Sequence, residues 1–380
     1  MQISKETDLK TRYHGLDALR GISMILGIAL HSTLPYIPNI EVIWPADRES
    51  SNVLWMVFEF IHIWRMPLFF LLAGFFANLV VTRRSWLSWW INRSIRLLIP
   101  MVIFFPLLGL TIPWIFEYGR TGEVRFFYSN TGQPFHLWFL WHLLIFTLLT
   151  IILRPLSLTY HMLEQVLVIM KLNLIVISMG NFKKLIADFI FRPRIPVLFI
   201  AIYCVVGIPT GGELILNPIS GALYFTLGYS LYGNNSLLSF LNRYWIFYLS
   251  SGVIFFIIYG LLITFESTQP KDLVSLIKIL LKAICSILFS FGFIGLAESK
   301  IKNLWKWPRF ISDSSYWMYL IHLPIVTFLT FVMFEISISP LFKFFVSSTI
   351  TLLVCLITYK YFVRHTLIGT ILNGKRSRTR

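Results

Sequence analysis

Long apolar runs dominate this sequence and limit what it can fold into. Run after run of 18 or more residues is almost free of charge, and 57% of the 380 residues are hydrophobic while 13% are charged. A soluble domain cannot bury so many runs, whereas each is long enough for a helix to cross the roughly 30 Å hydrocarbon core of a bilayer. A helix also satisfies its own backbone hydrogen bonds in lipid. The predicted fold class is therefore all-α, a polytopic membrane helix bundle of about ten transmembrane helices in a lipid bilayer.

The basic residues between the apolar runs predict the orientation of the chain. The formal net charge is +16, and much of it lies in short loops such as Glu298–Arg309. This is the positive-inside pattern and not a nucleic-acid-binding surface, so we expect no nucleic-acid partner and two cytosolic termini. The expected spans are about 15–36, 53–81, 97–116, 135–153, 195–210, 214–232, 244–265, 273–296, 312–334 and 340–362.

The region 154–194 is the longest stretch between expected spans, and its middle, 162–179, is apolar enough to be taken for another span. Counting it as a span would place every later basic loop outside. We therefore expect an interfacial or re-entrant helix here. The predicted organisation is a cytosolic leader (1–14), one transmembrane domain (15–365) that includes this segment, and a basic cytosolic tail (366–380).

The first expected span carries three ionisable residues on one face. Asp17 lies one turn before Arg20, and His31 follows Arg20 by eleven residues. Eleven residues are close to three helical turns, or about 16 Å along the axis. Ionisable residues inside a membrane are costly and usually functional. The alternative is an ion pair at the helix end and a histidine satisfied by a neighbouring helix.

Other spans bring further imidazoles to a similar depth. At 1.5 Å per residue, four histidines on four expected spans fall within a turn or two of one layer. One histidine alone is often a packing hydrogen bond, but four at one depth favour a shared polar cavity. The imidazoles are those of His31, His62, His142 and His322, with Arg65 and Glu59 one turn to either side of His62.

Two further sets of cations stand out. Arg93 and Arg96, spaced i, i+3 at the start of the third span, are either interfacial arginines or a pair that binds phosphates. Lys278 and Lys282 lie on the eighth span. Lys278 is near enough to the end to reach the interface, whereas Lys282 needs a carboxylate partner or an aqueous cavity.

These residues resemble the motifs of the acyltransferase 3 family of integral membrane acyltransferases. Arg20-x10-His31 is similar to its hallmark and Arg93-x-x-Arg96 to its second motif. The chain most resembles the short, stand-alone branch that succinylates periplasmic glucans, because Trp141-His142 stands where the longer O-antigen acetylases carry a Glu-containing segment. The resemblance to the short branch also leads us to expect no appended hydrolase-like domain. The stretches Phe60-Ile61-His62-x-x-Arg65, His136-Leu137-Trp138 and Ser315-x-x-x-Tyr319-Leu320-x-His322 carry the rest of the resemblance.

The resemblance implies a reaction between a cytosolic donor and an external acceptor. The donor would be acyl-CoA, as succinyl-CoA or acetyl-CoA, with its phosphates on Arg93, Arg96 and Arg20. The acceptor would be a hydroxyl of an extracytoplasmic glycan or glycolipid. The protein would lie in a bacterial inner membrane and need no resident cofactor or metal.

The same resemblance assigns roles near the middle of the membrane. His31 would be the general base, because an imidazole has a pKa near neutrality, and Asp17 would orient or neutralise Arg20. His62, Arg65 and His322 are candidate donors to the oxyanion. The remaining candidate cavity residues are Glu59, His136, Trp138, His142 and Tyr319.

Two other functions are compatible with intramembrane histidines. A transporter or flippase would use them as a proton relay, and it predicts symmetry between the two halves and helices broken at the midplane. A lipid-linked glycosyltransferase usually needs intramembrane carboxylates for a metal or a base, and these are scarce here.

Overall fold

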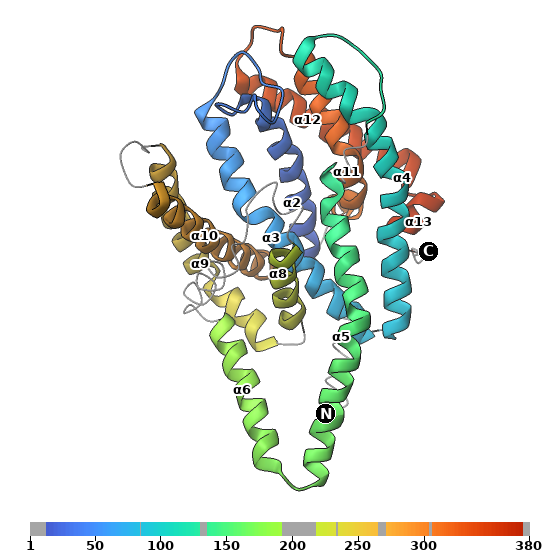
Figure 1. Ribbon diagram of the computed structural model, residues 1–380, viewed down its shortest axis with the longest axis vertical. Coiled ribbons are helices and arrows are strands. Elements are labelled where there is room, and N and C mark those ends of the chain that lie inside the picture. Colours follow the sequence, from blue (N-terminus) through green and yellow to red (C-terminus); the bar gives the residue numbers. More distant parts are fainter. Residues whose placement is uncertain are drawn as a thin grey trace.

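The computed structural model describes residues 13–83, 85–129, 135–191, 218–232, 235–264, 271–303 and 306–374, and these residues contain helices but no strand. The prediction of an all-α polytopic bundle is confirmed (Figure 1). The α-helices are α2 (His14–Thr33), α3 (Asn52–Arg83), α4 (Trp86–Thr121), α5 (Trp138–Ile169), α6 (Asn173–Phe191), α8 (Pro218–Leu231), α9 (Asn235–Thr264), α10 (Lys271–Lys300), α11 (Lys306–Val332), α12 (Pro340–Thr358) and α13 (Leu367–Asn373). Short 3-10 or π turns are η1 (Leu34–Tyr36), η2 (Phe135–Leu137) and η4 (Tyr359–Val363).

Within the described residues, eight helical segments are long and apolar enough to cross a membrane. They coincide with eight of the ten predicted spans, so the chain is a multi-pass membrane protein. The predicted span 214–232 corresponds to α8, a helix of 14 residues. The predicted span 195–210 lies outside the described residues.

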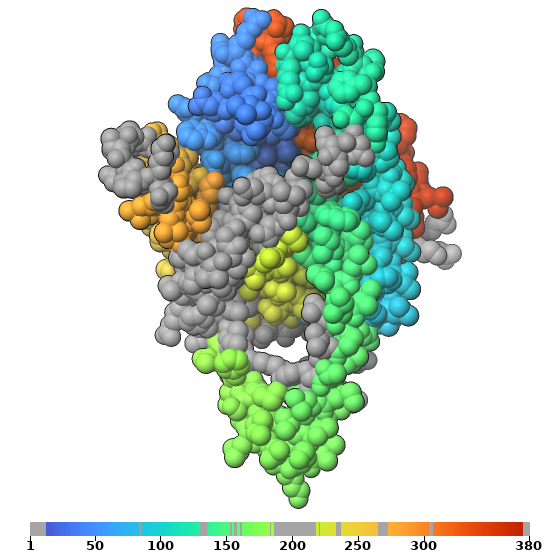
Figure 2. Space-filling model, viewed as in Figure 1, coloured from blue at the N-terminus to red at the C-terminus, as the bar shows by residue number. Residues whose placement is uncertain are grey.

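The region 154–194 differs from its prediction. Helix α5 continues through Pro155 to Ile169, and α6 follows after a turn in which Lys171 has a left-handed φ of 59°. The two helices form a hairpin that projects from the bundle (Figures 1 and 2). The expectation of one helix over 162–179 was therefore wrong, because its apolar run belongs to two helices and hydropathy does not show the turn between them. That this segment does not cross the membrane stays a prediction.

The helices define two ends of the bundle, and candidate site residues lie toward both. We call the end at which α2 begins, α3 ends and α4 begins the lower end. The opposite end, where residues 37–51 connect α2 to α3, is the upper end. Helix α11 also runs from lower to upper end and α12 returns, because Ser312 lies beside Arg20 and Lys343 beside Asp47.

Helix α2 is held centrally by its neighbours. No side chain of its own caps its first turn, but the Glu298 carboxylate on α10 accepts a hydrogen bond of 2.9 Å from the Leu16 N–H. An anion at a helix N-terminus satisfies a free donor and complements the helix dipole. Gly21 lets α2 approach α11, because a Cβ there would lie 3.1 Å from an Ile311 methyl carbon. These contacts fix the position of α2, which carries both Arg20 and His31.

Candidate active site

Arg20 lies at the lower end of α2, in the seam with α11. Its guanidinium donates to the Ser312 carbonyl at 3.2 Å and to the Ser312 hydroxyl at 3.0 Å. The Asp17 carboxylate is 3.7 Å away, so the predicted pair exists, although it is loose. Arg20 is thus positioned by α11 as well as by Asp17.

Three imidazoles meet further up the bundle, from α2, η2 and α11. The ring centroids of His31 and His322 are 5.2 Å apart, and those of His322 and His136 are 5.1 Å apart. A shared layer of histidines was predicted, but His136 stands in it where His142 was expected. Within the described part of the chain, no three His, Cys, Asp or Glu side chains are arranged to share a metal ion.

Hydrogen bonds fix the tautomer of His322. Its Nδ1 lies 3.0 Å from the Met318 carbonyl and 2.9 Å from the Tyr319 carbonyl. A carbonyl only accepts, so Nδ1 carries the hydrogen and Nε2 carries the lone pair. This Nε2 is buried and has no hydrogen-bond partner among the described residues. His322 therefore offers an acceptor, not a donor, to a neighbouring group.

His136 and Tyr319 lock each other in place. The His136 Nε2–H donates to the Tyr319 carbonyl at 2.9 Å, and the Tyr319 hydroxyl donates to the His136 carbonyl at 2.5 Å. Both predicted cavity residues are therefore present at the imidazole layer, where they join η2 to α11. The Nδ1 of His136 is left buried and unpaired within the described chain.

Arg65 lies below the imidazole layer with its guanidinium against α2. Gly27, one helical turn before His31, makes the room, because a Cβ there would collide with Nη1 of Arg65. Arg65 interacts electrostatically with His31, His322 and Tyr319. It is 8% exposed, and no carboxylate pairs with it in the described part of the chain. A buried cation without a counter-ion is unusual, because burial of an unpaired charge is costly.

Glu59, a predicted cavity residue, lies in an ion pair. Its carboxylate is 3.4 Å from Lys282 and accepts a hydrogen bond of 2.8 Å from Tyr259. This names the partner that Lys282 required. His62 packs on Phe58, with ring centroids 4.9 Å apart, and interacts electrostatically with Glu59, Lys282 and Arg65. His62 therefore connects the Glu59–Lys282 ion pair electrostatically to Arg65, below the imidazole layer.

His142 and Trp138 form a separate aromatic cluster. Their ring centroids are 5.4 Å apart, and both pack on Phe70, at 6.0 and 6.3 Å. His142 is fully buried. Its predicted depth was close, but it belongs to the packing between α3 and α5 and not to the group formed by His31, His136 and His322.

Three arginines gather at the lower end, as predicted. Arg93 interacts electrostatically with Arg96 and Arg20. Arg96 lies against Gly374, and its carbonyl accepts a hydrogen bond of 2.5 Å from Tyr316. Arg93 has no carboxylate partner within the described residues. Like charges held close together repel, and an anion between them removes that repulsion.

Trp44 is a residue of this region that the sequence analysis missed. It stands in the loop 37–51, yet its ring lies nearly parallel to that of His31, with centroids 6.3 Å apart. The available signal was the apolar tract Val42-Ile43-Trp44 between the charged residues Glu41 and Asp47.

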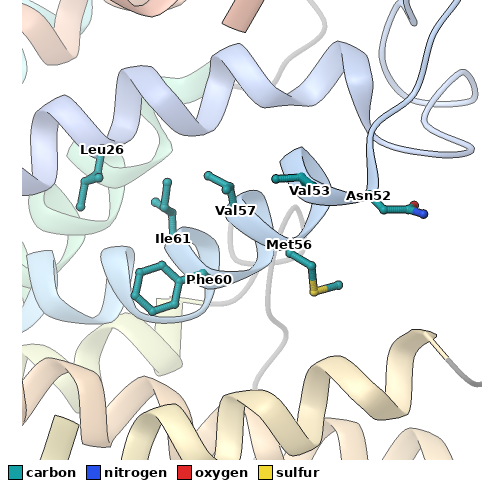
Figure 3. Close-up of a pocket in the computed structure, with 7 residues that line it drawn as sticks. All are labelled: Leu26, Asn52, Val53, Met56, Val57, Phe60 and Ile61. Carbon is teal, nitrogen blue, oxygen red and sulfur yellow. The ribbon is translucent and has the colours of Figure 1, made fainter. Parts of the chain in front are cut away.

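An apolar pocket of about 610 Å³ lies between α2 and α3 near the upper end (Figure 3). None of the predicted site residues lines it, and Asn52 is its one polar side chain. It provides no cation for a polyanionic donor. Its lining consists of Leu26, Asn52, Val53, Met56, Val57, Phe60 and Ile61.

The bundle thus has the properties of a membrane enzyme, with cations at one end of a helix and buried imidazoles toward the other. A family model described as an acyltransferase domain matches residues 13–360. The chain belongs to this family, the acyltransferase 3 family, as its motifs predicted.

Relatives named "Glucans biosynthesis protein C" align with part of the chain. The protein from Escherichia coli K12 is 31% identical over 152 residues, which cover 37% of this chain and 38% of the relative. That from Shigella dysenteriae serotype 1 is 32% identical over 151 residues, with the same coverage. The alignments thus span less than half of each relative. No solved structure gave a significant match.

Proposed function

We propose that this protein transfers an acyl group from cytosolic acyl-CoA to a hydroxyl of an extracytoplasmic glycan or glycolipid. The observation that supports this most is the arrangement along α2. Arg20 joins Arg93 and Arg96 at the lower end, and His31 joins two further imidazoles about three turns above. One helix thus connects a site for a polyanion with a site for proton transfer.

The lower end suits the phosphates of acyl-CoA. A guanidinium binds phosphate through two parallel hydrogen bonds, which a lysine cannot reproduce. The donor would rest on Arg20, Arg93 and Arg96, and its acyl arm, succinyl or acetyl, would extend toward His31. This requires the lower end to face the cytosol, with both termini on that side of a bacterial inner membrane.

His31 is the general base of the proposed reaction. The acceptor oxygen attacks the thioester carbon while His31 takes the hydroxyl proton, and a tetrahedral oxyanion forms. The carbonyl then re-forms, the carbon–sulfur bond breaks, and the proton passes to the departing CoA thiolate. An imidazole must be neutral to start this cycle, and low-dielectric surroundings favour its neutral form.

Arg65 is the proposed donor to the oxyanion. A guanidinium only donates, and this one is buried beside His31 without a counter-ion among the described residues. His322, also a candidate from the sequence, carries its lone pair on the free Nε2 and so is not a donor in this tautomer. It is instead the second candidate for the base.

The glycan acceptor rests on the relatives. Their printed name concerns glucan biosynthesis, and we extend that substrate class to this chain. A transporter is favoured less, because the described helices α3 and α11 run unbroken past His62 and His322, whereas the proton-relay hypothesis expected broken helices.

Replacement of His31 tests this function. In purified His31→Ala protein, acyl transfer from radiolabelled succinyl-CoA or acetyl-CoA to a gluco-oligosaccharide should fall by at least about 10²–10⁴-fold, because general-base catalysis contributes that much. Donor binding should persist, since the arginines are untouched. His31→Asn should be as inactive as His31→Ala. His365→Ala, which removes an exposed imidazole near the lower end, is the control.

Near wild-type transfer by folded His31→Ala would move the base to His322. Absence of any ester on glycans from cells that express the wild-type protein, checked by mass spectrometry against cells that lack it, would refute the acyltransferase function toward glycans.

A further inference from the structure

The loop 37–51 folds back onto the upper end of the bundle and brings Trp44 to the imidazole layer. The Trp44 and His31 rings are inclined by only 22°, with centroids 6.3 Å apart. Phe116 on α4 and Phe331 on α11 pack edge-on against the same indole, at 4.6 and 6.5 Å. The indole is thus held between three helices although it belongs to a loop.

A buried ion pair fixes this loop. The Lys343 ammonium lies 2.7 Å from the Asp47 carboxylate, and the two side chains are only 3% and 1% exposed. The Asp47 N–H also donates to the Pro35 carbonyl at 2.9 Å, and the Ser51 N–H to the Tyr36 carbonyl at 2.8 Å. Burial of two charges is costly and tolerates little movement. The loop therefore has one defined position, and so does Trp44.

The polar atoms of Trp44 and His31 are left unsatisfied together. Nε1 of Trp44 and Nδ1 of His31 are both buried, and neither has a hydrogen-bond partner among the described residues. Such atoms lose the hydrogen bonds that water would provide, so a ligand that pairs with both is favoured. The indole N–H can only donate, whereas a neutral imidazole accepts on one nitrogen.

A hydroxyl group has the hydrogen-bonding chemistry that these two atoms need. Its oxygen accepts from the indole N–H while its own hydrogen is donated to the imidazole. A sugar ring also suits the indole, because the C–H face of the sugar is apolar and packs on an aromatic surface. The chemistry of Trp44 beside His31 therefore matches a carbohydrate that presents a hydroxyl to the base.

We propose that Trp44 is an acceptor-binding residue, which stacks on the acceptor sugar and donates its indole N–H to the hydroxyl that receives the acyl group. This rests on the proposed function, because it assigns His31 as the base. It adds a specificity-determining residue on the loop, outside every motif noted in the sequence. The acyl donor, which is bound at the lower end, does not require Trp44.

Two variants separate the contribution of the aromatic face of Trp44 from that of its indole N–H. Trp44→Phe keeps an aromatic face and removes the N–H, so the KM for a short gluco-oligosaccharide should rise about fivefold, the effect of one hydrogen bond. Trp44→Ala removes both, and the KM should rise about 10- to 100-fold. The dissociation constant of acyl-CoA should not change in either variant.

Trp114→Phe is the matched control, because Trp114 packs on Phe126 and Phe328 near the upper end and has no ring contact with His31. The KM of this control should stay near the wild-type value. If the two Trp44 variants show no larger rise than Trp114→Phe, Trp44 does not bind the acceptor. A rise confined to Trp44→Ala would mean that stacking alone operates and that the indole N–H takes no part.

Direct binding keeps this test independent of catalysis. Calorimetric titration of the purified protein with the gluco-oligosaccharide, without any donor, should show the same order of affinity among the variants. If the wild-type protein binds the sugar through Trp44 but transfers no acyl group, the proposed function fails and this inference stands. If it transfers acyl groups but its sugar affinity is independent of Trp44, the inference fails and the proposed function stands.

Discussion

Lys343 and Arg65 are both buried cations of one bundle, and they differ in what neutralises them. The Lys343 ammonium is 2.7 Å from the Asp47 carboxylate. Arg65 has imidazoles and a tyrosine as neighbours, with its Nε unpaired and no carboxylate partner among the described residues. The first cation is satisfied by folding alone. The second is left for a ligand, which in the proposed reaction is the tetrahedral oxyanion.

Lys282 extends the comparison to the other side of the bundle. It pairs with Glu59 at 3.4 Å, and Tyr259 donates to the same carboxylate. It was unassigned in the sequence, because its partner lies 223 positions away on α3 and no local pattern connects them. Like Lys343, it is a cation whose charge is paired with a carboxylate from a distant part of the chain.

The largest expected effect is on stability, in Lys343→Met. Removal of the cation leaves Asp47 buried and unpaired, and loss of one partner of a buried pair costs about 3–5 kcal/mol of the free energy of unfolding. Unfolding in detergent, followed by circular dichroism, measures this. The double variant Lys343→Met with Asp47→Asn should recover most of the loss, because no buried charge remains.

Arg48→Ala is the control for that prediction. Arg48 pairs with Glu335 at 2.5 Å, but both side chains are about three-quarters exposed. An exposed pair contributes only about 0–1 kcal/mol, so this variant should unfold almost as the wild type does. Equal losses in Lys343→Met and Arg48→Ala would show that burial does not distinguish the two pairs.

Arg65→Met should give the opposite result to Lys343→Met. No carboxylate is left unpaired, so the free energy of unfolding should be unchanged or higher. The rate of acyl transfer should fall by about 10²–10³-fold, as after loss of one oxyanion donor. Arg65→Lys should restore part of the rate. The contrast between the two cations is wrong if Arg65→Met loses as much stability as Lys343→Met and its acyl-transfer rate falls no further than that of Lys343→Met.

The sequence predicted what depends on periodicity and spacing. Apolar runs located eight helices, and the interval from Arg20 to His31 placed both on one face of α2. The depth of a residue along its own helix was a weaker guide to which residues of other helices it contacts. His136 in η2 packs on His322 of α11, whereas His142 in α5 packs on Phe70 of α3. The rotation of one helix against another decides this, and hydropathy does not contain it.

Other features of the site depend on partners far apart in the chain. His136 exchanges its hydrogen bonds with Tyr319 on α11, and the room for Arg65 follows from Gly27 on another helix. The α5–α6 hairpin was missed for a related reason, since a turn inside a continuous apolar run leaves no gap in hydropathy.

The smallest expected effect concerns Arg93 and Arg96, the two arginines near the start of α4. Arg93 has no carboxylate partner within the described residues, as Arg65 has none, but it is half-buried at the lower end, where water and salt screen its charge. Each Arg→Ala change should therefore weaken acyl-CoA binding by only about 5- to 10-fold, less than a fully buried charge-assisted hydrogen bond would give. Arg→Lys should recover part of the affinity, since the charge returns without the two-pronged geometry.

The measurement is the dissociation constant of acyl-CoA for each purified variant at low and high salt. The wild-type affinity should fall with salt, and the double variant Arg93→Ala with Arg96→Ala should show a flatter dependence. Arg243→Ala on α9 removes an exposed cation outside the cluster and should leave the affinity unchanged. If the double variant binds acyl-CoA as tightly as Arg243→Ala does, the arginines of α4 only anchor their helix at the interface. The contrast between paired and unpaired cations would then hold for the buried residues alone.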